Sequence, residues 1–252
     1  MMTSGRTIVL VLWQACLIAY TTGILWLRRH PMSVAFAVVE PLSLLFVLIL
    51  FSGGEDIQLA LAGSLILAIV GTGLAVGEDI SYYKTEVKLQ DYFVASPVSP
   101  LAYMIGIALS DLLFDLPALV LLSIFAVFFV TSIVHVFLMI PTILLIWGMT
   151  SAIGFFLSSY IAHMRRAEEV IYLVEISLAM LPPVFYSIEY LPQEAQYFAY
   201  AVPTTHASLM LQHTMGFPTP PEWSPGLGIG IMIAYFIGFV ILAKTKAIWT
   251  ER

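Results

Sequence analysis

Four acidic residues of this 252-residue chain lie inside or beside long apolar segments. They are Glu40, Asp111, Asp115 and Glu175. A charge at the centre of a bilayer costs at least about 2.5–3.5 kcal/mol, so each carboxylate needs a partner, a wet cavity or a proton. Asp111 and Asp115 are four residues apart and therefore share one face of a helix. These four residues are our candidates for a substrate path or a gate.

A structural role competes with this functional one at each position. Glu40 lies about nine residues past Pro31 and could remain near the inner interface, and the start of the segment that carries Asp111 and Asp115 could still be interfacial. Glu175 is seven residues beyond Glu168, which is about 10 Å deeper along a helix. It has the strongest claim to face the interior, either on a substrate surface or as a structural hydrogen-bonding group.

No sequence motif predicts catalysis by this chain. A G-x-S-x-G nucleophile motif and a G-x-x-x-x-G-K-[ST] phosphate loop are both absent. His206 and His213 could bind a metal together with Glu189 and Glu194, but no tight spacing favours this. The single cysteine, Cys16, excludes an intrachain disulfide. We therefore predict no catalytic site, no metal site and no cofactor bound by this chain.

The composition indicates a membrane protein. Hydrophobic residues make up 60% of the chain and charged residues only 10%, whereas a soluble domain has about 25% charged residues. The net charge is −6 and basic residues never cluster beyond pairs, so nothing indicates binding to nucleic acid. We expect one all-α integral membrane domain over residues 1–252, in contact with membrane lipid.

Six apolar segments are predicted to cross the membrane, which needs about 20 residues for each span. The predicted spans are residues 34–52, 57–77, 101–130, 133–157, 170–188 and 227–243. This threading puts all ten Lys and Arg residues on one side. Cytoplasmic loops retain basic residues, so we expect that side, with both chain ends, to be cytoplasmic. The expected location is the plasma membrane.

Glycines recur in the second predicted span, at Gly63, Gly71, Gly73 and Gly77. Small residues allow two membrane helices to approach closely. We therefore expect a neighbouring helix to pack tightly against residues 57–77.

The N-terminal segment, residues 7–30, is ambiguous. Its apolar part is long enough to cross a bilayer, yet Gln14 and Gly23 interrupt it and a basic pair closes it. If this helix spans the membrane, Arg6 lies on the outer side, and nine basic residues are then on the inner side and one on the outer side. We favour a helix that lies along the inner interface, although its polar face is weak for such a helix.

The longest inner segment, residues 78–100, is predicted to contain an amphipathic helix over residues 80–94. Lys84, Lys88 and Asp91 fall on one face of that helix, at positions i, i+4 and i+7. A helix that packs on the membrane by one face offers the other face to a cytoplasmic partner. The alternative is a solvated charged face with no partner.

Residues 189–226 form the largest outer region, which contains no Lys or Arg. Within it, residues 192–211 could form two short helices broken at Pro203, because proline disrupts a helix interior. We expect residues 189–215 to cap the outer mouth of the protein.

The inner stretch at residues 78–106, with its Ser96-Pro97-Val98-Ser99-Pro100 turn, and the outer stretch at residues 183–207 occur in an order that resembles the ABC type-2 permease family. The inner stretch begins at Glu78-Asp79, contains Ser96-Pro97-Val98-Ser99-Pro100 and ends at Gly106. It resembles the family's coupling-helix region, in which an acidic stretch and a helix precede an "SPvSp" turn and a glycine. The acidic stretch departs from the common "E-R-E-x-G-T" form.

The outer stretch, residues 183–207, looks like the family's "P…LP" segment followed by an "nPlth" motif on short re-entrant helices. Thr205 replaces the usual Leu and Val202 the usual Asn. The resemblance assigns the outer re-entrant motif to Pro192, Pro203, Thr204 and His206. Arg29-His30-Pro31 and Glu40-Pro41 also fit the family pattern.

The resemblance implies a permease that works as a dimer with a second copy or a paralogue. Separate cytoplasmic ATPase subunits hold ATP and Mg, and their closure pushes on the coupling helix. Lys84, Lys88 and Asp91 are then the expected contacts with the ATPase. The substrate is usually extruded and can be a lipid, a drug-like amphiphile or a polysaccharide.

Two other functions stay open on the residues alone. An ion- or proton-coupled secondary transporter would use Glu175, Asp111 and Asp115 without an ATPase. An intramembrane enzyme would use His206, His213 and the outer carboxylates. The leading interpretation is the membrane subunit of an ATP-binding-cassette exporter.

Overall fold

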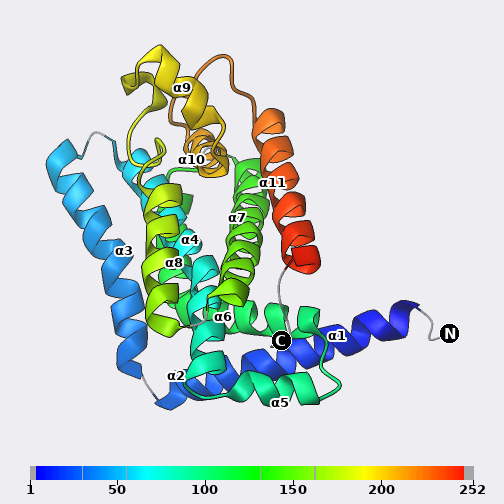
Figure 1. Ribbon diagram of the computed structural model, residues 1–252. Helices are drawn as coiled ribbons and strands as arrows, with labels where there is room; N and C mark the ends of the chain where they lie inside the picture. The colour runs from blue at the N-terminus through cyan, green and yellow to red at the C-terminus, as the bar shows by residue number, and fades with distance from the viewer. Residues whose placement is uncertain (1–3, 30, 55, 131, 162, 247–252) are drawn as a thin grey trace.

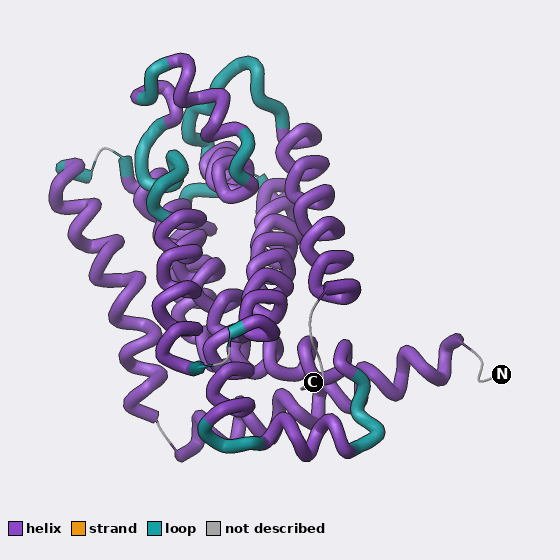
Figure 2. Tube along the Cα trace, in the orientation of Figure 1, coloured by secondary structure: helices purple, strands orange, loops and turns teal. Residues whose placement is uncertain are grey.

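The computed structural model describes residues 4–29, 31–54, 56–130, 132–161 and 163–246. Every regular element in these residues is a helix (Figure 2). In chain order the elements are α1 (Ser4–Ala19), the π-helix η1 (Tyr20–Ile24), α2 (Leu25–Arg29), α3 (Pro31–Ser52), α4 (Ile57–Thr85), α5 (Leu89–Ala95), α6 (Pro100–Val127), α7 (Ile133–Tyr160), α8 (Met164–Ala179), the 3₁₀ helix η2 (Ile188–Tyr190), α9 (Gln193–Tyr200), α10 (Pro203–Thr214) and α11 (Pro225–Lys246).

Five helical segments within the described residues are long and apolar enough to cross a membrane. They are Val9–Arg29, Ile57–Thr85, Pro100–Val127, Ile133–Tyr160 and Pro225–Thr245. Ala37–Ser52 is a shorter apolar helical segment. The chain is therefore an all-helical, multi-pass membrane protein.

The prediction of six spans is confirmed only in part. Four predicted spans coincide with α4, α6, α7 and α11, whereas the predicted span at 34–52 corresponds to the shorter segment Ala37–Ser52. The predicted span at 170–188 is wrong in its bounds, since α8 has 16 residues and ends at Ala179. The helix stops ahead of Pro182 and Pro183, because a residue that precedes proline avoids the helical conformation.

Helix α4 occupies the centre of the bundle and packs against α3, α6, α7 and α8 (Figure 1). Glycines permit its closest contact, with α7. A Cβ added at Gly77 would lie 2.7 Å from the carbonyl oxygen of Gly154, and one added at Gly154 would lie 2.9 Å from that of Leu74. This confirms the prediction that small residues bring a neighbouring helix close to this segment.

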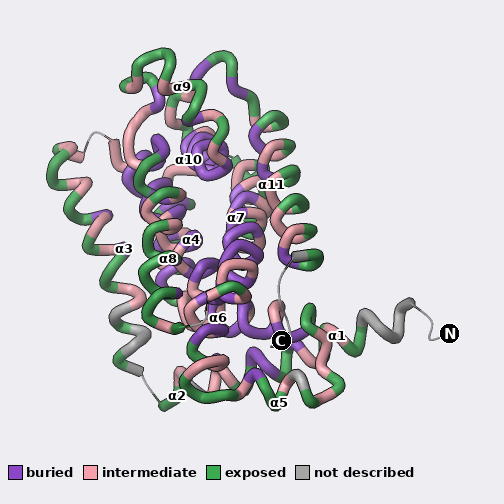
Figure 3. The backbone as a smooth tube through the Cα atoms, in the orientation of Figure 1, coloured by how far each residue is buried: buried purple, intermediate pink, exposed green. Residues whose placement is uncertain are grey.

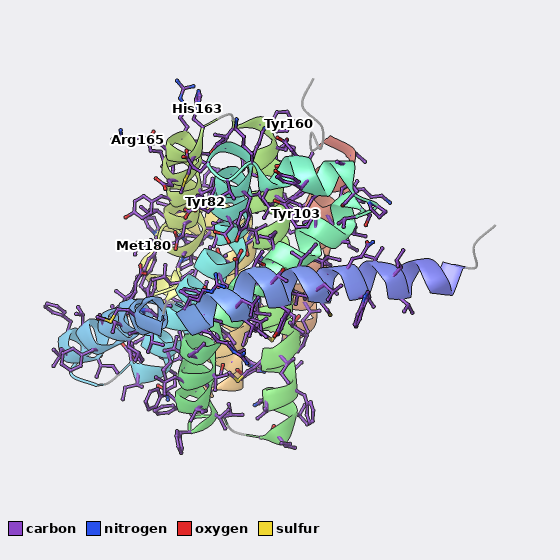
Figure 4. The ribbon with its side chains drawn as sticks, turned by 90° about the horizontal axis from the view of Figure 1, so that it is seen from below. Tyr82, Tyr103, Tyr160, His163, Arg165 and Met180 are labelled. Carbon is purple, nitrogen blue, oxygen red and sulfur yellow. The ribbon has the colours of Figure 1, made fainter. Side chains whose placement is uncertain are left out.

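The N-terminal helix α1 runs across the lower end of the bundle in Figure 1, below the long helices, and Figure 4 shows it crossing that end from below. Ala15 and Ile18 are buried against α6, where a Cβ at Gly106 would lie 2.7 Å from the Cβ of Ile18. The other side exposes apolar groups, including Trp13 at 63%. The transverse arrangement is consistent with a helix at a membrane surface, and that location stays a prediction.

The predicted single helix over residues 80–94 is wrong. Helix α4 continues to Thr85, and α5 begins only at Leu89. Between them Lys88 adopts a left-handed conformation with φ 55°, and the chain turns from α4 into α5, which lies across the lower end of the bundle in Figure 1. Lys84 thus belongs to the last turn of α4, while Asp91 lies in the first turn of α5. The three charged residues do not share one helix face.

The upper end in Figure 1 is formed by η2, α9 and α10. Two short helices separate just before Pro203, which is the first residue of α10, as the sequence predicts. Helix α10 is buried over nearly its whole length and lies on α7, α11 and α4 (Figure 3). Its re-entrant placement in a membrane remains a prediction.

Candidate functional site

A first cavity of about 260 Å³ opens between α3, α4, α6 and α8, and each of these helices contributes a carboxylate to it. The carboxylates belong to Glu40, Glu78, Asp115 and Glu175, in chain order. Glu40 is exposed at its position, and the other three are half-buried. The cavity therefore collects acidic groups from four different helices.

A second cavity of about 320 Å³ lies beside the first and shares Asp115 and Ala75 with it. Asp79 of α4 and Asp111 of α6 also line this second cavity. The π-helix η1 contributes Thr22 and Gly23. Single-turn π-helices occur frequently at functional sites. The N-terminal segment thus forms part of a cavity wall.

Helix geometry explains how neighbouring acidic residues reach separate cavities. Glu78 and Asp79 are consecutive on α4, so their side chains leave the helix about 100° apart. Glu78 faces the first cavity and Asp79 the second. Gly71 lies seven residues before Glu78 on the same face, and its missing side chain leaves room for the carboxylate of Glu175.

The carboxyl groups lie close to polar neighbours across the helices. Thr72 lies beside Asp115, although its hydroxyl donates to the carbonyl oxygen of Ala68, and Asp79 lies beside Asp111. The Oδ2 atom of Asp111 is buried and has no hydrogen-bond partner among the described residues.

Basic residues are absent from the described residues that line either cavity. Buried charges are normally paired or neutralised. The two cavities therefore have the chemistry of a site that takes protons or a positively charged group.

Three of the four predicted path residues, Glu40, Asp115 and Glu175, meet in the first cavity, and the fourth, Asp111, lines the second. Sequence reasoning missed Glu78 and Asp79 as cavity residues, because it assigned them to the loop before the coupling helix. The seven-residue spacing from Gly71 to Glu78 could have indicated that α4 continues through them.

The predicted ATPase contacts lie at the lower end of the molecule, around the turn from α4 to α5 (Figure 1). Lys88 and Asp91 are exposed, and Lys84 is half-buried. Glu86, in the same turn, is also exposed. This surface carries charges of both signs.

At the opposite end, the predicted outer motif divides between two helices. Pro192 is the exposed residue before α9, while Pro203, Thr204 and His206 are buried in α10. The Thr204 hydroxyl donates a hydrogen bond to the carbonyl oxygen of Leu178. The motif therefore connects α10 to the end of α8.

His206 has both ring nitrogens occupied. Trp223 Nε1–H donates to Nδ1 of His206 at 3.2 Å. Nε2 must then carry the proton and donate to the carbonyl oxygen of Tyr200, at 2.8 Å. Burial lowers the pKa of His206, so the ring is neutral at pH 7.

The outer histidines do not form a metal centre in the part of the chain that the structure describes. His213 makes edge contacts with the rings of His135 and Trp223. No group of three or more His, Cys, Asp or Glu that could hold a metal ion was found among the described residues.

Residues 13–215 match the family model described as ABC-2 type transporter. The match covers most of the chain, and the chain belongs to this family as a transporter membrane domain. Comparison with curated proteins gave no match. Members of the family are non-catalytic permeases that pair with an ATPase subunit. The enzyme hypothesis based on His206 and His213 is therefore wrong.

Proposed function

We propose that this chain is the membrane subunit of an exporter that moves an amphiphilic, lipid-like or polysaccharide substrate outward, driven by a separate ATPase. The observation that carries the proposal is the position of α5. This short helix lies at one end of the bundle, connects α4 to α6, and presents exposed charges at Lys88 and Asp91. The chain itself contains no phosphate loop.

The proposed orientation puts the α5 end in the cytoplasm of a plasma-membrane protein. Helices α3, α4, α6, α7, α8 and α11 are the six spans, and α1 lies along the inner interface. Both termini are then cytoplasmic, although residues 1–3 and 247–252 lie outside the described residues. The orientation is supported by the basic residues in the described part of the chain, which fall at the α5 end in this threading.

In the proposed mechanism, ATP-driven closure of the partner pushes on Lys84, Lys88 and Asp91. The two helices joined by α5 are those that carry the second cavity's carboxylates, Asp79 on α4 and Asp111 on α6. Movement of α5 therefore changes the distance between these two groups. The same movement reaches the first cavity through Glu78 and Asp115, and there Glu40 and Glu175 complete the path.

The partners follow from this function. ATP and Mg bind to the ATPase subunit, and this chain holds no cofactor. A second copy or a paralogue completes the dimer. Helix α3 exposes large apolar side chains, with Phe46 and Leu50 each at 63% and Phe51 at 88%, and these face lipid or the second permease.

Affinity purification of the tagged chain from its native membrane tests the proposal. We expect a nucleotide-binding subunit to copurify, and reconstituted complex to move a fluorescent phosphatidylcholine analogue only with ATP. The triple variant Lys84→Glu, Lys88→Glu, Asp91→Lys should reach the membrane but lose the ATPase. Reversal of two exposed charges at the opposite end, Glu189→Lys and Glu194→Lys, is the control. Normal export by the triple variant would rule out the proposed contact.

The convergence of acidic residues favours a second candidate function, an ion- or proton-coupled transporter. Unpaired carboxylates inside a membrane protein commonly carry protons. Transport by this mechanism would persist without ATP and collapse when the proton gradient is removed. The same reconstituted vesicles distinguish the two functions when an uncoupler and ATP are varied independently.

A further inference from the structure

The export mechanism alone does not explain why so many acidic groups line the two cavities. Four helices bring six carboxyl groups into adjoining spaces, if Asp115 is counted once. No Lys, Arg or His is among the described residues that line them. Because the site lies inside a membrane domain, a bound anion would be repelled and a bound cation attracted.

Asp111 provides an independent observation that points to a ligand. Its side chain is only 7% exposed and lines the second cavity. Its Oδ2 atom has no hydrogen-bond partner among the described residues. A buried acceptor normally has a partner, so this oxygen is free to interact with the positive charge of a bound group.

The residues that line the two cavities indicate which kind of cation would bind there. No group of three or more metal-binding side chains was found in the described part of the chain, so the carboxylates are too dispersed for a metal ion. Tyr82, Tyr83 and Phe114 line the second cavity together with the carboxylates. Aromatic faces attract organic cations through cation–π contacts. Apolar side chains such as Leu67 and Ile171 complete the first cavity.

The size of the site agrees with a small amphiphile. The cavities measure about 260 and 320 Å³ and share a wall at Asp115, and ligand pockets usually measure about 300–1,000 Å³. A molecule with one positively charged head and an apolar body would place its head between carboxylates and its body against the apolar wall.

We infer that the substrate of this transporter is an organic cation, an amphiphile that carries a protonated or quaternary amine. Asp111 and Asp115 bind the charged head, and Glu175 extends the acidic surface into the first cavity. The inference rests on the proposed export function, since it names the substrate class for the same site.

A binding measurement on the complete transporter in lipid nanodiscs tests this inference. The probe is radiolabelled benzyltrimethylammonium, whose charge is permanent. Neopentylbenzene has the same shape without the charge and serves as the competitor. We expect saturable binding that the neutral molecule does not displace.

Isosteric variants locate the site. Asp111→Asn and Asp115→Asn should each weaken binding of the probe at least tenfold, and Asp115→Glu should restore most of it. Glu169→Gln is the matched control, because Glu169 is exposed on the same helix as Glu175 and lines neither cavity. Size-exclusion profiles identify any variant that fails to fold. If Asp115→Asn does not fold, the Asp115→Glu variant, which keeps the carboxylate, still tests the site.

Three results would overturn the inference. They are the absence of saturable binding, equal displacement by the neutral molecule, and unchanged affinity in folded Asp111→Asn and Asp115→Asn variants. Failure of the proposed function gives a different result, since no ATPase would copurify while the isolated chain would still bind the cationic probe.

Discussion

The carboxylate of Glu175 lies directly beside Gly71, so that a Cβ on the glycine would come within 2.9 Å of Glu175 Oε1. The two residues belong to α8 and α4, and both line the first cavity. The glycine therefore has a role different from that of Gly77 on the same helix, which contacts backbone atoms of α7. One glycine makes space for an acidic group, and the other makes space for a helix.

This difference leads to a prediction for Gly71→Leu. The larger side chain should fill the first cavity and displace the Glu175 carboxylate, because Glu175 is the only described residue outside α4 with atoms within 4 Å of the added Cβ. We expect ATP-driven export of the fluorescent phosphatidylcholine analogue to fall at least tenfold, while the ATPase remains bound. Gly230→Leu is the control, since no described atom outside its own helix backbone lies within 4 Å of a Cβ at Gly230. Normal export by Gly71→Leu would show that the cavity is not on the path.

Gly73 should respond differently, through stability. An alanine Cβ there would overlap the Thr150 side chain and lie 2.9 Å from the backbone oxygen of Trp147. Because backbone cannot move aside cheaply, Gly73→Ala should destabilise the protein by about 1–3 kcal/mol. Gly230→Ala should be neutral or stabilising by up to about 1 kcal/mol, the usual helix-propensity gain. Thermal unfolding of both variants in one detergent measures the difference.

The sequence was a good guide where one local property decided the structure. Apolar length located α4, α6, α7 and α11, and proline marked the start of α10. Three of the acidic residues in apolar segments line one cavity, and their role in a substrate path stays a prediction. A proline in a helix interior and a charge inside a bilayer each cost a large free energy. These residue types by themselves therefore restrict where the chain can place them.

The sequence did not predict the features that depend on tertiary structure. The end of α4 carries no glycine or proline, and the break at Lys88 uses a left-handed residue that the helical pattern does not reveal. Continuation of α4 to Thr85 carries Glu78 and Asp79 into the cavities, a consequence that periodicity alone could not give. The wall formed by η1 was also missed, because it depends on packing between distant segments.

The conformation of Lys88 makes a prediction about the turn before α5. Lys88 has φ 55°, a conformation that costs an L-amino acid about 1–2 kcal/mol and costs glycine little. Lys88→Gly should therefore preserve or improve stability, whereas Lys88→Val should lower it, since a β-branched side chain tolerates this conformation worst. Limited proteolysis of the turn between α4 and α5 reports the result.

Lys88→Gly and Lys88→Val both remove the positive charge but differ in how well they adopt the backbone conformation. Comparing them therefore distinguishes the effect of the conformation from that of a contact made by the charge. If the charge contacts the ATPase, the two variants should lose ATPase binding to a similar extent despite their different stability. Faster proteolysis of Lys88→Gly than of the wild-type chain would contradict the conformational argument. Full retention of the ATPase by both variants would contradict the contact.

The hydrogen bonds of His206 predict an acid-sensitive outer region. The pKa of His206 is lowered by burial, so the folded state favours the neutral ring. The unfolded chain takes up a proton as the pH falls through about 6.5, the usual histidine value, while the folded chain resists it. The contribution of His206 to the stability of the folded state is therefore fully present above that pH and decreases below it. Burial also lowers the pKa of the neighbouring His213, which acts in the same direction.

Thermal unfolding at pH 7.5 and 5.5 measures this effect in the intact protein. The wild-type chain should lose more stability on acidification than His206→Gln, because glutamine has no proton to gain. His163→Gln should lose as much as the wild type, since His163 is exposed before the first residue of α8, whereas α10 contacts the opposite end of that helix at Leu178. A protonated His206 could no longer accept from Trp223, so Trp223→Phe should also reduce the pH dependence. An equal acid loss in His206→Gln and the wild type would exclude His206 as its source.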